Sequence, residues 1–501
     1  MSVTALDNED RQSHKSPFLR TGEEYRQGLR DNRRVIYQGE EIRDVTTHPL
    51  FKRSVDRWAG IFDAQFDPAT VDVTTYFDEK LGDRASTAWL VPESKAHLAQ
   101  RRHLLEYSSD QTFGVYGRMP DYGPTLAMGF LSGMHLIEEA EPDAPAKIKE
   151  FIDFGRENNL LSTDLIADAQ SDRSRSPGEN PGRLRCVKET EEGIVVYGTK
   201  PVASSASMGD WGGIATLLSP DMDPDTVMWA YVKMGSPGIT FVAREQVTSA
   251  SDTAEDHPIN HLGEEIDALI VFDNVLIPWE HVFSFRNKST LAYYLEVCVL
   301  PHWAILARMA RRARYFAAAA KMVTEILGTD KIPPVRAQVA EIYAYSTALE
   351  SFILAAEDKG EHTPHGIFLP DRTNITAGRL YAITQLPVIM QHLRELCGQG
   401  LVSRFTKADL EREDVGAWID EFMPGHNITG RGKNRLMNFI WDLTCSAHAA
   451  RVTLFENVNS TPPPIVRQQV YQSYDTSEAE KLIRDATELD QYRTTVAEAA
   501  E

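Results

Sequence analysis

Phe113-Gly-Val-Tyr-Gly-Arg118-Met-Pro-Asp-Tyr122 is the most informative stretch of this sequence, because a glycine and proline turn brings an arginine and a tyrosine four residues apart. Arginine stays charged at any working pH, so its guanidinium can hold an anionic oxygen, and a nearby phenol hydroxyl can orient the same group. The stretch therefore predicts a fixed cation at a binding site in the first third of the chain. The alternative is that Arg118 only forms a salt bridge or anchors the turn, and that Tyr122 has a structural role as well.

Helical patterns lie on both sides of this stretch. Thr21-Gly-Glu-Glu24 is a capping box, which predicts a helix from Thr21 to about residue 31. Residues 35–42 are typical of a short hairpin around Gly39. Further helices are expected near 49–65, 93–112, 124–140 and 144–158. We expect residues 1–17 to be disordered and residues 18–159 to form an N-terminal helical domain.

Strand patterns replace helical ones between residues 160 and 287, which we assign to a β-barrel-like middle domain. Its strand candidates are rich in β-branched and aromatic residues. They cover 184–188, 193–200, 228–233 and 238–243. A loop rich in proline and glycine at 176–182 interrupts the pattern. The segment Phe272-Asp-Asn-Val-Leu-Ile-Pro-Trp279-Glu280-His-Val-Phe283 ends it.

Helical periodicity returns after this segment. Long helices are expected at about 290–328, 334–358, 371–397 (bent at Pro387) and 433–457, with an acidic amphipathic tail after them. Residues 288–501 thus form a C-terminal four-helix bundle with a tail for oligomerisation. A helical domain, a β-domain and four long helices follow one another in acyl-CoA dehydrogenase-like proteins. The predicted fold class is therefore mainly α with a central β-domain.

Composition excludes several classes of protein. The chain has 501 residues, 42% hydrophobic content and a net charge of -21, which argues against binding to nucleic acid or to an anionic membrane. No apolar run long enough to span a membrane is present, and residues 1–17 lack the apolar core of a signal peptide. The four scattered cysteines indicate reduced thiols in a cytoplasmic protein. We expect the basic run Arg308, Arg311, Arg312 and Arg314 to form a solvated or subunit-facing stripe.

The stretches 113–122 and 272–283 together resemble the oxygenase component of the two-component flavin monooxygenases typified by 4-hydroxyphenylacetate 3-monooxygenase. The resemblance extends from about Thr21 to about Glu456. It implies hydroxylation of a phenol ortho to its hydroxyl by a C4a-hydroperoxyflavin, with O2 as co-substrate. FADH2, in preference to reduced FMN, would come from a separate NAD(P)H:flavin reductase, and the chain would form a homotetramer. The absence of a G-x-G-x-x-G or Walker motif agrees with a chain that has no NAD(P)H site.

This reaction requires an ionised phenol. Lowering a phenol pKa from about 10 by about three units takes roughly 4 kcal/mol of differential stabilisation. We assign this role to Arg118, and contact with substrate or peroxide to Tyr122. His302 is the expected base, since a histidine in this region resembles the base of relatives that attack halophenols and nitrophenols. An unperturbed imidazole, with a pKa near 6.5, suits that task. A structural role for His302 is the alternative.

The segment 161–174 resembles the family stretch that lines the flavin and the substrate. Hydroxyphenylacetate hydroxylases show a Thr-His pair where this chain has Thr163-Asp164. A carboxylate cannot donate a hydrogen bond to a phenolate unless it is protonated, but it could pair with a substrate amine or with Arg118. We therefore expect a phenol other than 4-hydroxyphenylacetate, either amine-bearing or tethered to a carrier, with Asp164 in contact with it.

Small and polar residues around these segments are the expected cofactor contacts, by the same resemblance. The flavin would be bound by Thr163, Gln170, Asp172, Arg173, Ser204 and Arg451, and Ser205 would contact the substrate. Each of these residues could instead be an ordinary loop or turn residue.

Other kinds of site have weaker support. We expect no metal site, and no Ser-His-Asp pattern is present. The iron–sulfur cluster of the related 4-hydroxybutyryl-CoA dehydratase requires cysteines in the first helical domain, and residues 1–185 contain none. Two alternatives stay open: a flavin-using CoA-thioester dehydratase or dehydrogenase of the same fold, and a non-catalytic flavin-binding oligomer.

Overall fold

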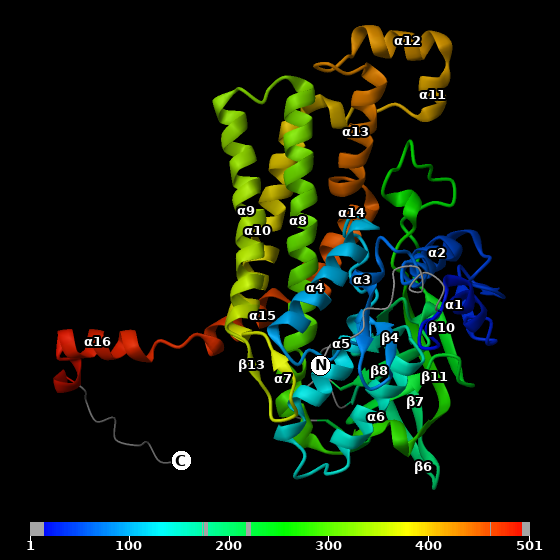
Figure 1. Cartoon of the computed structure of the whole chain (residues 1–501), viewed down its shortest axis with the longest axis vertical. Coiled ribbons are helices and arrows are strands. Elements are labelled where there is room, and N and C mark those ends of the chain that lie inside the picture. Colours follow the sequence, from blue (N-terminus) through cyan, green and yellow to red (C-terminus); the bar gives the residue numbers. More distant parts are fainter. Residues whose placement is uncertain (1–14, 173, 175–178, 217–221, 461, 493–501) are drawn as a thin grey trace, which may run out of the picture.

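A computed structural model of the chain describes residues 15–172, 174, 179–216, 222–460 and 462–492. Helices come first, two packed sheets follow, and long helices stand beside them in an elongated bundle (Figure 1). Most buried apolar side chains belong to one continuous core that joins all three regions. The predicted fold class, mainly α with a central β-domain, is confirmed.

The N-terminal region begins with the predicted capping box. The Thr21 hydroxyl accepts from the Glu24 amide at 3.2 Å, the Glu24 carboxylate accepts from the Thr21 amide at 2.7 Å, and α1 (Gly22–Gly28) follows. The predicted hairpin is formed by β1 (Arg34–Tyr37) and β2 (Glu40–Ile42), with Gly39 at a φ of 83°. The helices after it are α2 (Pro49–Asp63), α3 (Val71–Thr74), α4 (Lys95–Asp110), α5 (Tyr122–Gly133) and α6 (Ala144–Glu157). A second hairpin, β3 (Thr75–Asp78) and β4 (Asp83–Ser86), was not predicted.

The expectation of disorder for residues 1–17 covers two different parts. Residues 1–14 lie outside the described residues. Residues 15–17 are placed, and Ser16 is buried with its hydroxyl donating to the Arg84 carbonyl at 2.7 Å. For these three residues the prediction is wrong, because a local polar composition does not reveal a distant backbone acceptor.

The middle region consists of two sheets. The six-stranded sheet has the order β2-β1-β10-β11-β7-β6, and the four-stranded sheet has the order β12-β9-β8-β5. Their remaining strands are β5 (Ser162–Leu165), β6 (Arg185–Glu189), β7 (Gly193–Ser204), β8 (Trp211–Ala215), β9 (Met228–Lys233), β10 (Ile239–Ala243), β11 (Asp267–Pro278) and β12 (Val282–Phe285). Each strand candidate at 184–188, 193–200, 228–233 and 238–243 overlaps one of these strands. Of the predicted loop at 176–182, residues 176–178 lie outside the described residues.

Helix α5 joins the sheets to the bundle. It is apolar on every face and buried along its length after Tyr122, as expected for a helix surrounded by other elements. Glycines permit this contact: a Cβ at Gly123 would lie 2.2 Å from the Ser162 carbonyl oxygen of β5, and one at Gly129 would lie 2.2 Å from that of Val297. The first turn of α5, which carries Tyr122, is therefore held against the strand that carries Asp164.

The bundle contains the predicted long helices, two of them divided. Its helices are α8 (Val299–Leu327), α9 (Pro333–Asp358), α10 (Arg372–Cys397), α13 (Gly430–Thr444) and α14 (Ala447–Leu454). The expected helix at 290–328 begins instead as a 3-10 turn and the short α7 (Tyr294–Val297) before α8. The expected helix at 433–457 is interrupted because Ser446 caps α14, its hydroxyl accepting from the Ala449 amide at 3.1 Å. A π-helical turn, Phe455–Asn459, follows α14.

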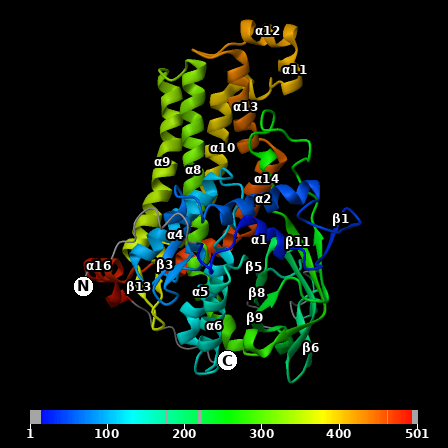
Figure 2. The same ribbon diagram turned by 45° about the vertical axis from the view of Figure 1, so that its right-hand side comes forward.

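The tail lies apart from the body. After α15 (Pro463–Ser473), helix α16 (Ser477–Thr487) projects away from the bundle (Figures 1 and 2). The remaining short elements are β13 (Glu361–His362), β14 (Phe368–Leu369), α11 (Lys407–Glu411) and α12 (Glu413–Phe422). None of the helices in the described ranges combines the length and the apolar composition needed to cross a membrane.

Candidate functional site

Arg118 lies in the turn between α4 and α5 and is buried, with 8% of its surface exposed. Its Nη1 donates to the Gly117 carbonyl at 2.8 Å and to Glu456 Oε1 at 3.0 Å. The guanidinium carbon lies 4.6 Å from the ring centroids of both Tyr122 and Phe455. Burial alone would lower the pKa of Arg118, but Glu456, Tyr122 and Glu265 together outweigh burial, and the pKa lies above its ordinary value. The structure thus provides a permanent cation that does not face bulk water.

Gly117 makes the ion pair of Arg118 possible. A Cβ at this position would lie 2.6 Å from Glu456 Oε1, so any larger residue would displace the carboxylate. The backbone at this turn is also held from outside: the Glu265 carboxylate accepts from the Gly117 amide at 3.1 Å and from the Arg118 amide at 2.7 Å. Three segments far apart in the sequence therefore meet at Arg118.

Tyr122 and Asp164 are close enough to Arg118 for their charges to act on one another. Burial raises the pKa of Tyr122 above its ordinary value, the Arg118 charge offsets only part of this, and the phenol stays neutral. Both carboxyl oxygens of Asp164 are buried and, among the described residues, have no hydrogen-bond partner. Burial raises the pKa of Asp164 well above its ordinary value despite the Arg118 charge. A direct hydrogen bond between Asp164 and Arg118, one of the two pairings we considered, is therefore not formed.

His302 lies in the first turn of α8. Burial lowers the pKa of His302 well below its ordinary value, and the charges of Arg379, Arg372 and Arg118 lower it further. The expectation of an unperturbed imidazole is wrong, because sequence does not show that three cations surround this position. The structure nevertheless brings His302 into the electrostatic neighbourhood of Arg118, and the ring is neutral at pH 7.

Asp267, at the start of β11, joins several of the residues expected to bind a flavin. Its Oδ1 accepts from the Ser204 hydroxyl at 2.7 Å, and its Oδ2 forms ion pairs with Arg451 of α14 and, at 3.0 Å, with Arg244 Nε. The Thr163 hydroxyl in turn donates to the Ser204 carbonyl at 2.6 Å. Thr163, Ser204 and Arg451 are thus brought together across the sheets and the bundle, although Asp267 itself was not predicted.

The other expected cofactor and substrate contacts differ in their surroundings. Ser205 has a φ of 58°, and its hydroxyl is buried without a hydrogen-bond partner in the described part of the chain. Gln170 and Asp172 are exposed on the loop after β5, where Asp172 accepts from the Ser174 amide at 3.0 Å. Arg173 lies outside the described residues.

Two residues of the basic run of α8, Arg308 and Arg312, do not lie on the solvated or subunit-facing stripe that we expected. Arg308 and Arg312 are 5% and 6% exposed, whereas Arg314 is exposed and Arg311 pairs with Asp110 at 2.6 Å. Arg308 forms an ion pair with Asp121 and donates to the Met119 carbonyl at 2.6 Å. The prediction failed because α8 packs with this side against the Arg118 turn.

Arg312 and Arg379 are two of the buried arginines that have unsatisfied donors. Arg312 Nε and Nη2, and Arg379 Nε and Nη1, have no hydrogen-bond partner within the described ranges. Burial lowers the pKa of Arg379 to about 10, so both side chains remain cations at neutral pH. A cavity of about 20 Å³, large enough for a water molecule, lies between Arg312 and Glu456. Free guanidinium donors in a dry region fit a ligand with anionic or hydrogen-bond-accepting oxygens.

Two family models cover almost the entire chain. The model described as 4-hydroxyphenylacetate 3-hydroxylase N terminal matches residues 21–284, and the model described as 4-hydroxyphenylacetate 3-hydroxylase C terminal matches residues 290–488. The chain belongs to the 4-hydroxyphenylacetate 3-hydroxylase family. The resemblance inferred from the sequence is thereby confirmed.

Individual members of the 4-hydroxyphenylacetate 3-hydroxylase family show how similar the chain is. It is 31% identical over 452 residues to an FADH(2)-dependent monooxygenase of Burkholderia cepacia, covering 89% of this chain and 87% of that protein. It is 29% identical over 471 residues to a 2,4,6-trichlorophenol monooxygenase of Cupriavidus pinatubonensis, covering 92% and 90%. The crystal structure of the oxygenase component of 4-hydroxyphenylacetate 3-monooxygenase complexed with FAD superposes with a TM-score of 0.87 at 28% identity, covering 95% of this chain and 100% of that one.

Several site residues of this family member were not predicted from its sequence. No sequence motif marks the residues that contact the site or place a charge beside it, which are Glu265, Glu456, Asp267 and Arg379. Glu456 ends the late helical segment noted for its family resemblance, and this position was its only signal. No group of three or more His, Cys, Asp or Glu side chains that could hold a metal ion occurs in the described part of the chain.

Proposed function

We propose that this chain is a reduced-flavin-dependent monooxygenase that hydroxylates a phenol ortho to its hydroxyl, with O2 as co-substrate and FADH2 from a separate reductase. The single observation that carries the proposal is the buried guanidinium of Arg118, fixed beside Tyr122. Membership in a family whose relatives include a trichlorophenol monooxygenase supports the same reaction.

Arg118 would stabilise the phenolate form of the substrate. A unit charge about 4 Å away at an effective dielectric constant of about 20 contributes about 4 kcal/mol, which lowers a phenol pKa by about three units. For Arg118 alone, before the opposing charge of Glu456 is counted, a phenol with an ordinary pKa near 10 would therefore ionise close to pH 7. Since Tyr122 stays neutral, its hydroxyl can donate to an oxyanion without competing for the cation.

His302 would accept the phenol proton. The neutral imidazole that its lowered pKa produces is the form that a base requires. Because the same lowered pKa disfavours the imidazolium form, the proton would leave His302 for solvent as the phenolate forms beside Arg118.

FAD fits the residues that the structure provides. The unsatisfied donors of Arg312, Arg379 and Ser205 are suited to phosphate and flavin oxygens. We propose that Thr163, Ser204 and Arg451 hold the cofactor, together with the loop residues Gln170, Asp172 and Arg173. When bound, FAD supplies the activated oxygen that is transferred to the aromatic ring.

Asp164 would select the substrate. Its carboxyl group is buried and unsatisfied, so a substrate group with an N–H or O–H donor would gain a partner there. An amine-bearing or carrier-tethered phenol supplies such a donor, and Ser205 offers a second contact. We propose that 4-hydroxyphenylacetate, whose acidic group would lie beside this carboxyl, is a poor substrate.

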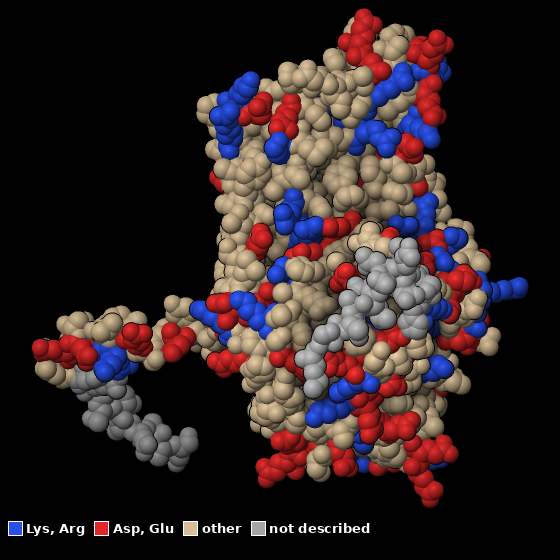
Figure 3. All heavy atoms as spheres, viewed as in Figure 1, with Lys and Arg blue, Asp and Glu red and all other residues tan. Residues whose placement is uncertain are grey.

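We propose domain boundaries at 18–159, 160–287 and 288–501, and a homotetramer assembled through the bundle and the tail. The outer surface of the bundle is largely uncharged in Figure 3. Its exposed apolar side chains include Met322, Tyr343, Leu354 and Val388, which are 41% to 49% exposed. All four cysteines are free, which supports a reducing, cytoplasmic location. Light scattering on the purified protein would test the assembly.

A panel of phenols tests the reaction. The protein is loaded with FADH2 under nitrogen and mixed with oxygenated buffer and each phenol, and catechol and hydrogen peroxide are quantified. The proposal expects catechol from at least one phenol, and a loss of catechol with more peroxide for Arg118→Ala. Peroxide without catechol from every phenol tested would contradict it.

A further inference from the structure

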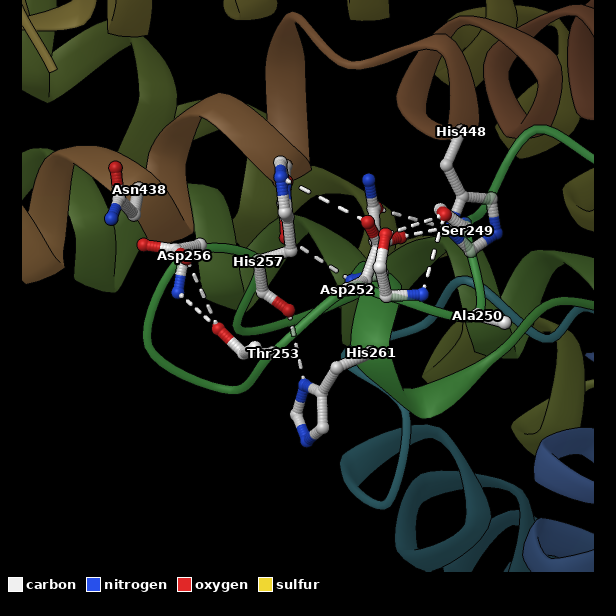
Figure 4. Close-up of polar contacts among 12 residues, drawn as sticks. Ser249, Ala250, Asp252, Thr253, Asp256, His257, His261, Asn438 and His448 are labelled. Carbon is white, nitrogen blue, oxygen red and sulfur yellow. Dashed lines mark hydrogen bonds and ion pairs between the residues drawn. The ribbon is translucent and has the colours of Figure 1, made fainter. Parts of the chain in front are cut away.

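Residues 244–266, which we call the strap, connect β10 to β11. The strap leaves the six-stranded sheet and reaches the lower end of α13 (Figure 1). Figure 4 shows its residues Asp252, His257 and His261 beside Asn438 of α13 and His448 of α14. The strap therefore lies between the sheet and the C-terminal helices.

The C-terminal end of the strap holds the segment that carries Arg118. The Glu265 carboxylate accepts from the amides of Gly117 and Arg118, at 3.1 Å and 2.7 Å. The Tyr116 hydroxyl donates to the Leu262 carbonyl at 3.4 Å. Three consecutive residues that end at Arg118 are thus bonded to two residues of the strap, Leu262 and Glu265.

The opposite side of the strap is held by Asp442 of α13, which is fully buried. Its Oδ2 accepts from the backbone amides of Ile259 and Asn260 at 3.0 Å and 3.1 Å, and its Oδ1 lies 3.2 Å from His257 Nδ1. His448 Nδ1 lies 3.3 Å from Asn260 Oδ1. One carboxylate therefore fixes the turn that precedes the Glu265 contact.

Between these two attachments the chain has little freedom. Gly263 has a φ of 88°, and a Cβ there would lie 3.0 Å from the Tyr116 hydroxyl and 2.9 Å from Arg53 Cβ. The Ser54 hydroxyl donates to the Glu264 carbonyl at 2.6 Å. The chain between the 259–260 turn and Glu265 is therefore short and closely packed.

We infer that Asp442 is a positioning residue for Arg118: it fixes the strap at residues 259–260, and the strap fixes the Arg118 backbone through Glu265. The inference rests on the proposed function, in which Arg118 holds a phenolate. Glu456 binds the Arg118 guanidinium, so the backbone and the side chain of this arginine are both placed by the segment 442–456. A misplacement of about 1 Å at a reacting group can cost about 100-fold in rate.

The test compares Asp442→Ala with Asp442→Asn and with a matched control, Asp78→Ala. Asp78 is also a buried carboxylate that accepts from two consecutive amides, Lys80 at 2.9 Å and Leu81 at 3.1 Å, but it lies in the β3–β4 hairpin. Binding of 4-nitrophenolate to the FAD-saturated protein is followed by its absorbance, and stability is followed by thermal unfolding. No turnover is needed for either readout.

Asp442→Ala should weaken 4-nitrophenolate binding by about 10- to 100-fold. Asp442→Asn keeps an oxygen for both amides and should retain most of the affinity. Asp78→Ala should lower the melting temperature without changing the affinity. If Asp442→Ala does not fold, Asp442→Ser takes its place. The serine side chain is too short for its hydroxyl to reach the position of the carboxylate.

Two outcomes separate this inference from the proposed function. If Arg118→Ala weakens binding while Asp442→Ala only lowers the melting temperature, as Asp78→Ala does, the positioning role is wrong and the proposed function stands. If Arg118→Ala leaves 4-nitrophenolate binding unchanged, the proposed role of Arg118 is wrong, and the inference fails with it.

Discussion

Replacement of Glu456 by glutamine would reveal how strongly Arg118 acts on a bound phenol. Glu456 Oε1 is 3.0 Å from Arg118 Nη1, and the glutamate is buried, with 9% of its surface exposed. Glutamine has the same shape and keeps an oxygen for the guanidinium, but it removes the negative charge. The variant therefore leaves the cation in place without its neutralising partner.

The size of the effect follows from the geometry. A phenolate on the far side of the guanidinium would lie about 7 Å from the Glu456 carboxylate, where two unit charges interact by about 2 kcal/mol at an effective dielectric constant of about 20. Loss of this repulsion should lower the pKa of a bound phenol by between about one and two units. The free energy of unfolding of the variant should fall, because breaking a buried ion pair costs about 3–5 kcal/mol.

The assay is a pH titration of bound 4-nitrophenol, whose phenolate absorbs in the visible range. Binding to FAD-saturated wild type and to Glu456→Gln is measured between pH 5 and 9, and urea unfolding of both proteins is measured in parallel. We expect a lower ionisation midpoint and a lower unfolding free energy in the variant.

Glu357→Gln is the matched control. Glu357 is also buried, with 1% of its surface exposed, but its partner is Arg102, whose Nε donates to it at 2.9 Å. This variant should lose stability and leave the ionisation midpoint unchanged. A midpoint for Glu456→Gln that equals or exceeds that of the wild type would refute the reasoning, since the phenolate would then not feel the charge on Arg118.

Three further outcomes follow from the buried groups of the site. Burial raises the pKa of Asp164 in the folded state, so the folded protein becomes less stable as pH rises above about 4. Asp164→Asn should therefore raise the melting temperature at pH 7 and hardly change it near pH 4. Equal changes in melting temperature at the two pH values would contradict this. Because the pKa of Tyr122 lies above its ordinary value, Tyr122→Phe should not alter the shape of the 4-nitrophenol titration between pH 5 and 9. The loss of a wild-type inflection in this range would count against a neutral tyrosine. Asp267→Asn removes the carboxylate that pairs with Arg451 and Arg244, which should lower the free energy of unfolding in urea by about 3–5 kcal/mol. An unchanged urea unfolding midpoint would show that these ion pairs are dispensable.

Local features of the structure could be predicted from the sequence. The Thr21 capping box, the hairpin at Gly39, four strands of the middle region (β6, β7, β9 and β10) and the long bundle helices all depend on periodicity, caps and turn residues within about ten positions. The same local information located Arg118 and Tyr122 on one turn. It failed where one residue interrupts a pattern, as at Ser446, whose capping role divides a helix that periodicity alone would continue.

Only the tertiary structure decided what surrounds that turn. Arg118 and its ion-pair partner Glu456 are 338 positions apart, and no local pattern encodes such a pairing. Burial, which depends on how whole elements pack, placed Arg308 and Arg312 of α8 beside the site, raised the pKa of Asp164 and lowered the pKa of His302. Secondary structure follows from interactions between near neighbours in the chain, whereas the charge state of a site follows from desolvation and from ions contributed by every element packed against it.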